Sequence, residues 1–304
     1  MLKSKLVLGV VQLGMDYGLN NVSGQPSREE AFLILDTALA EGIDTFDAAW
    51  AYGTAEDILG EWIQTRAVAH KVKVISKMKP HALNDYTKDV KPQDAVRAEV
   101  KKSLKRLGVK SLDGYLLHTP QYLHNDAVIA GLREIKAAGL VHNIGVSIYN
   151  EDEALSAVEV GVDYIQAPYN AFDRRLDKTD FFDLAKNKGI IVFARSPFLQ
   201  GLFLMDPERI PPHLARARPH VKQFADIARR HNTSRLEAAL LFACNSRADS
   251  VVFGVETLSQ LKEILSITAR FHSAGTDCVK EISDTFQNID TTIVNPSLWS
   301  ETKK

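Results

Sequence analysis

The chain has 304 residues, of which 45% are apolar and 25% are charged, and its 37 basic and 38 acidic side chains leave a formal net charge of −1. These proportions are those of an ordinary globular protein that can bury a sizeable core without disulfides or metals. They argue against a nucleic-acid surface and against a polybasic patch for binding a membrane.

The chain begins with MLKSKLVLGVVQLG, whose apolar run is too short to span a membrane. The stretch also lacks a cleavage-like site of small residues, so we expect a cytoplasmic protein. The two cysteines, Cys244 and Cys278, form neither a CxxC pair nor a Cys/His cluster. We therefore expect no disulfide framework and no structural zinc site.

Eight short apolar runs recur along the chain, and polar turns and segments of helical period lie between them. The runs are residues 6–9, 43–48, 72–77, 113–118, 142–147, 163–169, 189–196 and 250–255. Val, Ile and Leu are frequent in them without alternation, which is typical of strands buried on both faces of a parallel sheet.

The amphipathic segments between the runs have recognisable ends. The first opens with Ser27 as the expected N-cap, which Glu30 completes to a capping box, and it closes at Gly42. Four more segments stop on a glycine just before a run, namely Gly108, Gly139, Gly161 and Gly189. Eight strand–helix units predict a (β/α)8 TIM barrel. An open doubly wound sheet is the alternative, but GxGxxG is missing after the first run.

We expect one domain over residues 1–304, with the barrel at about 5–271 and a C-terminal helix and tail at 272–304. No linker rich in Pro, Gly or Ser divides the chain. The proline-rich residues 197–220 follow the seventh run, and because loops after barrel strands gather at the catalytic face, we expect them to overhang a site there. The tail carries one predicted helix, DCVKEISDTFQN, and Trp299.

Ionisable side chains stand at the ends of three successive runs. Asp47 ends the second run and Tyr52 follows it in the next loop, while Lys77 ends the third run and His118 the fourth. Because the carboxyl ends of neighbouring barrel strands converge on one pocket, we expect these four side chains to lie together. The set suits proton donation to an oxygen that becomes an alcohol.

Tyr52 is the expected proton donor. A phenol has a pKa of about 10 and is a weak acid at neutral pH, so an adjacent ammonium, Lys77, would favour its ionised form. Asp47 would keep that lysine charged, and His118 would orient the substrate oxygen. Taken singly, each residue has an ordinary structural explanation: Asp47 could cap a turn and Tyr52 could be a core aromatic residue. Lys77 could be a surface lysine, and His118 a strand-end histidine with its hydrogen bonds satisfied. Their combination at adjoining strand ends favours a site.

The chain resembles the aldo-keto reductase superfamily across nearly its whole length. The resemblance rests on LGVVQLG, GIDTFDAAWAYGTAEDILGEWI, VISKM, YLLHTP, IGVS, IQAPYN and RSPFLQGL. It implies a general acid at Tyr52, a tuning pair of Asp47 and Lys77, and a carbonyl-orienting His118. It also implies a nicotinamide cofactor and hydride transfer without a metal.

The resemblance implies a set of cofactor contacts as well. Ser147 and Gln166 match residues that bind the carboxamide of the nicotinamide. Asp47 is expected to contact the cofactor as well. The loop that wraps the pyrophosphate matches Ser196, Phe198, Leu199 and Gln200. The adenosine end matches the eighth run and the helix after it, from Gly254 to Glu263, with Gly254, Glu256, Gln260 and Glu263.

Three features depart from the family pattern, two near the nicotinamide and one at the adenosine end. Ile148 follows Ser147 where the family has an asparagine, so one amide contact is lost unless Asn150 replaces it. Arg195 stands where an aromatic residue often stacks; its planar guanidinium can also stack, pair with Glu256 or clamp an anion.

At the adenosine end, Gly254 and Gln260 are uncharged and Glu256 suits a free ribose hydroxyl rather than a phosphate. We therefore expect NAD(H) or NADP(H), leaning toward NAD(H), although Lys262 could restore phosphate binding.

The expected function is an NAD(P)H-dependent oxidoreductase acting on a small aldehyde, ketone or sugar. The alternative is a nicotinamide-binding regulatory barrel that senses the cofactor and acts through a protein partner. A metal-dependent or Schiff-base enzyme ranks last. We expect a small-molecule carbonyl substrate, no nucleic acid and no membrane; the sequence leaves the oligomeric state open.

Overall fold

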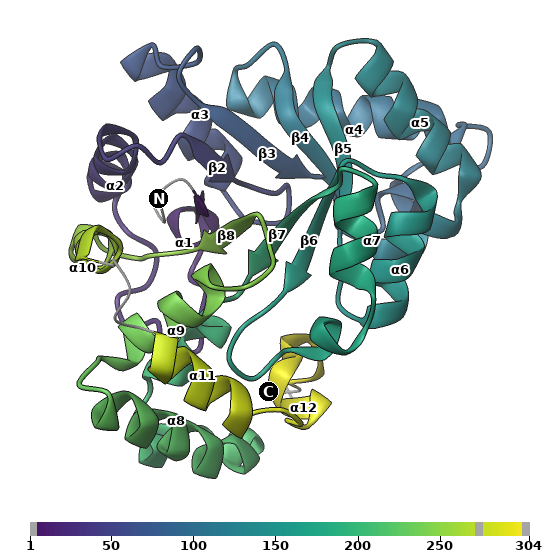
Figure 1. Cartoon of the computed structure of the whole chain (residues 1–304). Helices are drawn as coiled ribbons and strands as arrows, with labels where there is room; N and C mark the ends of the chain where they lie inside the picture. Colours follow the sequence, from purple (N-terminus) through teal and green to yellow (C-terminus); the bar gives the residue numbers. More distant parts are fainter. Residues whose placement is uncertain (1–4, 271–275, 300–304) are drawn as a thin grey trace.

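Eight parallel strands close into a barrel in sequence order, with β8 paired to β1. This computed structural model describes residues 5–270 and 276–299 (Figure 1). The strands are β1 (Leu6–Gly9), β2 (Thr45–Asp47), β3 (Lys73–Lys77), β4 (Leu112–Leu117), β5 (Val141–Ser147), β6 (Tyr164–Pro168), β7 (Ile191–Arg195) and β8 (Ser250–Phe253). The predicted (β/α)8 barrel is confirmed; six strands lie within their apolar runs, and β4 and β5 begin one residue before theirs.

Helices surround the barrel and continue past its last strand (Figure 1). They are α1 (Val11–Gly14), α2 (Arg28–Ala40), α3 (Ala55–Arg66), α4 (Pro92–Leu107), α5 (Asp126–Ala137), α6 (Glu151–Val160), α7 (Phe181–Asn187), α8 (Arg218–Arg230), α9 (Arg235–Cys244), α10 (Leu258–Arg270), α11 (Thr276–Thr285) and α12 (Thr291–Val294). None of the helices in the described part of the chain has the length and apolar composition needed to cross a membrane.

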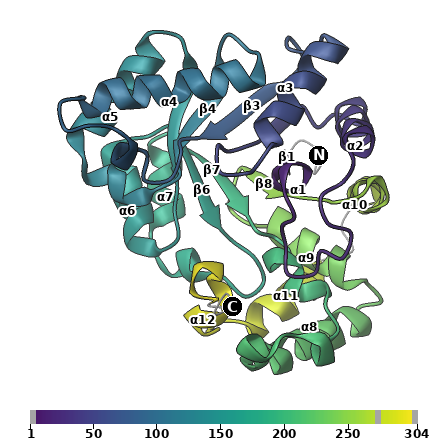
Figure 2. The same cartoon turned by 180° about the vertical axis from the view of Figure 1, so that it is seen from behind.

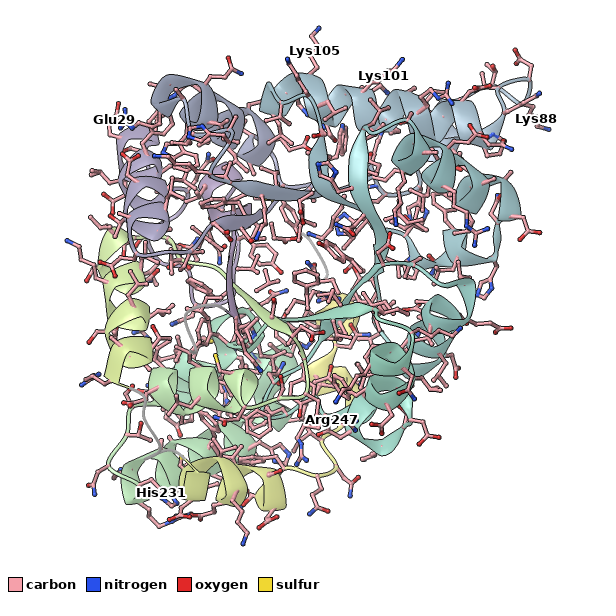
Figure 3. The ribbon with its side chains drawn as sticks, turned by 45° about the horizontal axis from the view of Figure 1, so that its top comes forward. Glu29, Lys88, Lys101, Lys105, His231 and Arg247 are labelled. Atoms are coloured by element: carbon pink, nitrogen blue, oxygen red, sulfur yellow. The ribbon has the colours of Figure 1, made fainter. Side chains whose placement is uncertain are left out.

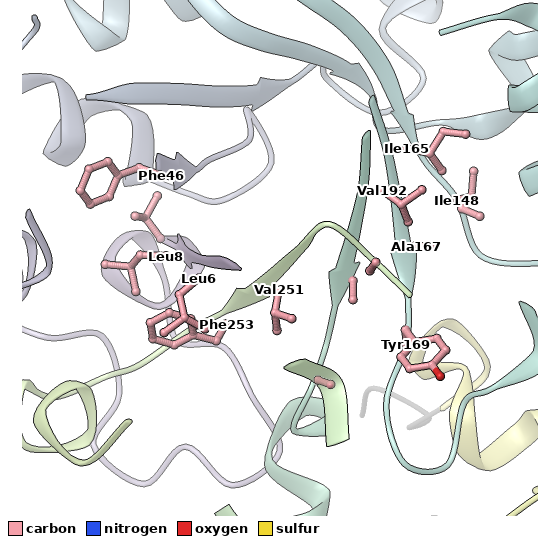
Figure 4. Close-up of a cluster of buried hydrophobic side chains, with 14 of the residues drawn as sticks. Leu6, Leu8, Phe46, Ile148, Ile165, Ala167, Tyr169, Val192, Val251 and Phe253 are labelled. Carbon is pink, nitrogen blue, oxygen red and sulfur yellow. The ribbon is translucent and has the colours of Figure 1, made fainter. Parts of the chain in front are cut away.

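The strands separate two apolar cores. Inside the barrel, one cluster joins five strands, with Val7, Ile75, Leu116, Phe193 and Val252. On β1, Leu6 and Leu8 alternate with Val7 and pack in the larger core between strands and helices, where Figure 4 shows them near side chains of β2 and β8. Because side chains on a strand alternate between its faces, both faces must be apolar, which explains the unbroken apolar runs.

The helix ends agree with the predicted signals in all but one respect. Ser27 caps α2 and accepts a hydrogen bond from the Glu30 amide at 3.2 Å. The Glu30 carboxylate does not complete a local capping box; it accepts the amide of Leu258 at 2.8 Å and so caps α10, 228 residues away. The glycines predicted to end five helices all adopt positive φ, namely Gly42, Gly108, Gly139, Gly161 and Gly189.

The segment after β7 and the C-terminal segment lie on the same side of the barrel. The proline-rich residues fold into η5 (Leu199–Leu204), η6 (Pro207–Arg209) and η7 (Pro212–Ala217) before α8 begins. Figures 1 and 2 show α11 packed beside α8 and α9. The predicted C-terminal helix corresponds to α11. The predicted barrel boundary at residue 271, the start of the tail at 272–275, and residues 1–4 and 300–304 lie outside the described residues.

Charged side chains extend outward from the helical layer. Lys101 and Lys105 on α4, and Lys88 in the loop before it, point away from the barrel (Figure 3). Inside, by contrast, Lys77 is fully buried.

Candidate functional site

Lys77 is the centre of a buried polar group at the ends of β2 and β3. Its Nζ donates to both carboxylate oxygens of Asp47 at 2.7 Å and to the carbonyl of Ala48 at 3.1 Å. It also donates to the hydroxyl of Tyr52 at 3.2 Å. Lys77 and Asp47 are 0% and 2% exposed, so their charges depend on one another rather than on water.

The loop that carries Tyr52 packs against the turn after β1. The amide of Thr54 donates to the carbonyl of Gly14 at 3.0 Å. A Cβ on Gly14 would lie 2.1 Å from the carbonyl oxygen of Tyr52, so only glycine permits this approach. This close backbone contact positions the Tyr52 backbone, from which the side chain extends to Lys77.

His118 follows β4 and faces Tyr52. Their rings meet edge to face, with centroids 5.9 Å apart and an interplanar angle of 88°. Burial, and then the charges of Lys77 and Arg195, lower the pKa of His118 to about 3. The imidazole is therefore neutral at pH 7 and can donate one hydrogen bond while its Nδ1, buried without a partner, marks an unused polar position.

The pKa of Tyr52 differs from the expectation drawn from the sequence. Burial raises it well above the ordinary value, and the carboxylate of Asp47 raises it further, while Arg195 opposes them. The sequence predicted that Lys77 lowers the pKa of Tyr52. The pKa is raised instead, because the cost of burying a phenolate is larger than its attraction to an ammonium whose charge Asp47 already neutralises. Tyr52 thus holds its proton firmly.

These side chains open onto a cavity of about 610 Å³, within the usual range for small-molecule sites. Asp47, Tyr52 and His118 line it, and Lys77 lies behind them. The predicted cofactor residues in its wall are Ser147, Gln166, Arg195, Ser196, Phe198, Gln200, Gly254, Glu256, Gln260 and Glu263. Leu199 is outside the lining: its side chain is buried in the core, and its amide donates to the carbonyl of Ser196 at 3.0 Å.

The asparagine that the family pattern leads us to expect after Ser147 has no counterpart in the structure. Gln166 donates through Nε2 to Asp47 at 2.8 Å, and it is the register partner of Ser147. Ile148 is fully buried, and Figure 4 shows it near Ile165 in the apolar core. Asn150 does not replace the missing group, because its side chain caps α6.

Arg195 reaches across the top of β6. Its Nη2 donates to the carbonyl of Ile148 at 2.9 Å, and its guanidinium carbon lies 4.8 Å from the ring centroid of Tyr149. The side chain therefore borders the cavity beside Tyr149. The predicted alternative of a pair with Glu256 is not among the contacts of Arg195.

At the other end of the cavity, Gln260 fixes Glu256. Its Nε2 donates to the Glu256 carboxylate at 2.6 Å, and its Oε1 accepts the Glu256 amide at 2.8 Å. The side-chain amide of Gln12 packs against Gly254, where an added Cβ would lie 2.2 Å from Oε1 of Gln12. Lys262 does not line it.

Several lining residues were not predicted from the sequence. Tyr17 follows α1, and its hydroxyl accepts a hydrogen bond from Gln200 at 3.2 Å. Burial, followed by the nearby Tyr52, raises the pKa of Tyr17 to about 12. Tyr149 and the tail residues Pro296 and Ser297 also line the cavity. The signal for Tyr17 was its position in the loop after the first strand, which must open at the same barrel end.

Comparison with known proteins agrees with this architecture. Residues 5–283 match the sequence model of the Aldo/keto reductase family. The chain belongs to the aldo/keto reductase family. This is a family of oxidoreductases, and its members' names include reductases and dehydrogenases.

Individual relatives are distant. The chain is 29% identical over 190 residues to an NADH-specific methylglyoxal reductase of Escherichia coli, a match spanning 56% of this chain and 58% of that protein. It is 25% identical to an L-galactose dehydrogenase of Arabidopsis thaliana, covering 85% and 84% of the two chains. A holo-form aldo-keto reductase from Bacillus halodurans superposes with a TM-score of 0.70 at 20% identity, over 91% of each chain.

Proposed function

We propose that this aldo/keto reductase transfers hydride between a nicotinamide cofactor and the carbonyl or alcohol carbon of a small aldehyde, ketone or sugar. The observation that carries the proposal is the hydrogen-bonded set of Asp47, Lys77 and Tyr52 beside His118 at one end of a cavity of about 610 Å³. Family membership supports the same chemistry.

The cavity suits a dinucleotide. Oε1 of Gln12, which lines the cavity beside Gly254, is buried without a hydrogen-bond partner and can accept a hydrogen bond from a ligand. Ser147, Gln166 and Arg195 would hold the nicotinamide end, and Glu256 the ribose of the adenosine end. When bound, the cofactor supplies or accepts the hydride.

The protein side of the reaction is a proton transfer at the Tyr52 hydroxyl. Neutral His118 donates a hydrogen bond that orients the substrate oxygen toward Tyr52. As that oxygen gains negative charge, it takes the phenol proton, which is otherwise held firmly. The hydrogen bond from Lys77 to the phenol oxygen, 3.2 Å long, stabilises the charge left on Tyr52.

Tyr52→Phe tests this assignment. Absorbance follows the oxidation of NADH and NADPH with a panel of aldehydes, ketones and sugars that includes methylglyoxal, and the reduction of NAD⁺ and NADP⁺ with L-galactose; these two compounds are named for two relatives. Removing the Tyr52 hydroxyl should lower kcat by about 10²–10⁴-fold with little change in cofactor affinity. Wild-type protein that binds cofactor but turns over nothing would instead favour a regulatory barrel.

The proposed preference is NADH. Glu256 places a carboxylate, fixed by Gln260, where a 2′-phosphate would add negative charge. Side-by-side titrations should give tighter binding of NADH than of NADPH. The variant Glu256→Gln should reduce the difference between these two affinities. Clear preference of the wild-type protein for NADPH would contradict the assignment.

A further inference from the structure

The catalytic end of the cavity carries an excess positive charge. Lys77 and Asp47 neutralise each other as a close pair. His118 is neutral at pH 7, because burial and then the nearby cations lower its pKa to about 3. Tyr52 keeps its proton. Arg195 remains, and among residues 5–270 and 276–299 no carboxylate forms an ion pair with it.

The contacts of Arg195 decide how this charge meets a ligand. Nη2 donates to the carbonyl of Ile148 at 2.9 Å, and Nη1 lies 3.5 Å from the hydroxyl of Ser196. Nε is buried and has no hydrogen-bond partner. The N–H edges are thus directed at protein or shielded, whereas a carboxylate or phosphate ligand binds arginine best through two N–H groups along one edge.

A flat ring fits this arrangement better than an anion does. The guanidinium already lies over one ring, that of Tyr149, with its carbon 4.8 Å from the centroid. Planar guanidinium groups stack on aromatic faces, and Arg195 also lines the cavity. The contacts therefore favour a stacking platform over an anion clamp.

From these contacts we infer that Arg195 makes the cavity selective for the reduced nicotinamide cofactor over the oxidised one. The inference rests on the proposed function, which places the nicotinamide ring beside Arg195. The ring is neutral when reduced and carries a positive charge when oxidised. A second cation within a few ångströms of a partly buried guanidinium is repelled, which corresponds to a preference of about 10- to 100-fold.

This selectivity affects which form of the cofactor occupies the site, and it leaves the overall equilibrium of the reaction unchanged. Protein that binds the reduced form more tightly is loaded for reduction even when the oxidised form is equally abundant. The oxidised form also leaves more readily after each turnover, because the same repulsion acts on it. At equal concentrations of the two forms, more of the protein is therefore ready for carbonyl reduction than for alcohol oxidation.

The test compares dissociation constants for NADH and NAD⁺, and in parallel for NADPH and NADP⁺, by isothermal titration calorimetry. The proteins are the wild type, Arg195→Phe, which keeps a flat group without charge, and Arg195→Lys, which keeps the charge. Wild type should bind the reduced form at least tenfold more tightly. Arg195→Phe should lower this ratio about tenfold, and Arg195→Lys should retain most of it.

Two controls isolate the charge effect. ADP-ribose, which lacks the nicotinamide ring, should bind Arg195→Phe as it binds the wild type, and this reports an intact site. Arg247→Phe removes another arginine that lies over a ring, that of Phe182 at 5.3 Å, outside the cavity lining (Arg247 is labelled in Figure 3). Its ratio should equal that of the wild type.

Equal affinity of the wild type for the two forms would overturn the inference, whether or not a variant folds. An unchanged ratio in Arg195→Phe would overturn it too. In both cases the proposed function would stand, because the cofactor still binds. Failure of the wild type to bind any of the four nucleotides would refute the proposed function and this inference together.

Discussion

The imidazole of His118 links the site to stability as well as to chemistry. Its folded-state pKa of about 3 lies below the value of about 6.5 expected in the unfolded chain. Between these two values the unfolded state binds a proton that the folded state does not. The stabilising contribution of neutral His118 is therefore complete above pH 6.5 and decreases as the pH falls toward 3.

We predict that His118→Gln makes stability less sensitive to acid. Between pH 7 and pH 5, the wild type should lose about 2 kcal/mol more unfolding free energy than the variant, at about 1.4 kcal/mol per pH unit below 6.5. Urea denaturation at several pH values measures this difference. Other titrating groups are common to both proteins and cancel. Parallel pH dependences in the two proteins would contradict the prediction.

The residues of the site differ in how far the sequence revealed them. Asp47, Tyr52, Lys77 and His118 could be placed together because each ends or follows a recognisable buried strand. Tyr17 could not, since its position depends on how an irregular loop folds back to Gln200. The raised pKa of Tyr52 was also beyond sequence reasoning, because it depends mainly on burial rather than on the neighbouring ammonium.

At the scale of elements, the position of α3 against α4 depends on one small residue. A Cβ on Gly60 would lie 2.3 Å from the carbonyl oxygen of Arg106 and 2.7 Å from the Cα of Leu107. Both neighbours are backbone atoms of a helix, so they cannot move without moving α4. The two helices therefore pack in direct backbone contact outside β2 and β3, the strands that carry Asp47 and Lys77.

We predict that Gly60→Ala destabilises the protein by roughly 1–3 kcal/mol, the usual cost of overpacking, despite the better helix propensity of alanine. Gly161→Ala is the matched control: Gly161 has φ of 76° at the end of α6, and nothing lies within 4 Å of an added Cβ. It should cost about 1 kcal/mol from backbone strain alone. Urea unfolding measures both, and a loss of unfolding free energy below about 1 kcal/mol for Gly60→Ala would show that α3 and α4 separate easily.

The elements themselves were predictable because their signals are local. A short apolar run without alternation indicates a buried strand without knowledge of its neighbours, and all eight strands were found from such runs. A glycine that ends the preceding helix marks five of them. The role of Glu30 was not predictable: it lies three residues after Ser27, as in a capping box, yet its carboxylate caps α10. The competing partner is 228 residues away, so only the closed barrel brings it near.

At the scale of the molecule, an aromatic cluster outside the barrel joins the segments that build the cavity wall. Phe172 follows β6 and packs on Phe203 of η5, with centroids 4.6 Å apart. Phe203 in turn packs on Phe224 of α8 at 4.8 Å, and Phe172 packs on Phe286 after α11 at 4.8 Å. The sequence predicted the segment after β7 and the C-terminal helix as separate additions, but not this shared core, because no pattern within either segment reports contact with the other.

This cluster makes the C-terminal segment part of the cooperative core. Phe286 is 1% exposed, so Phe286→Ala should remove about 3–5 kcal/mol of unfolding free energy through lost burial and a cavity. Leu298→Ala is the control in the same segment: Leu298 is 50% exposed, and its loss should change stability by less than about 0.5 kcal/mol. Chemical denaturation followed by far-ultraviolet circular dichroism and by tryptophan fluorescence should give one coincident, shifted transition for Phe286→Ala. If the two probes separate, or if Phe286→Ala is as mild as Leu298→Ala, the segment unfolds independently and cannot hold Pro296 and Ser297 rigidly at the cavity.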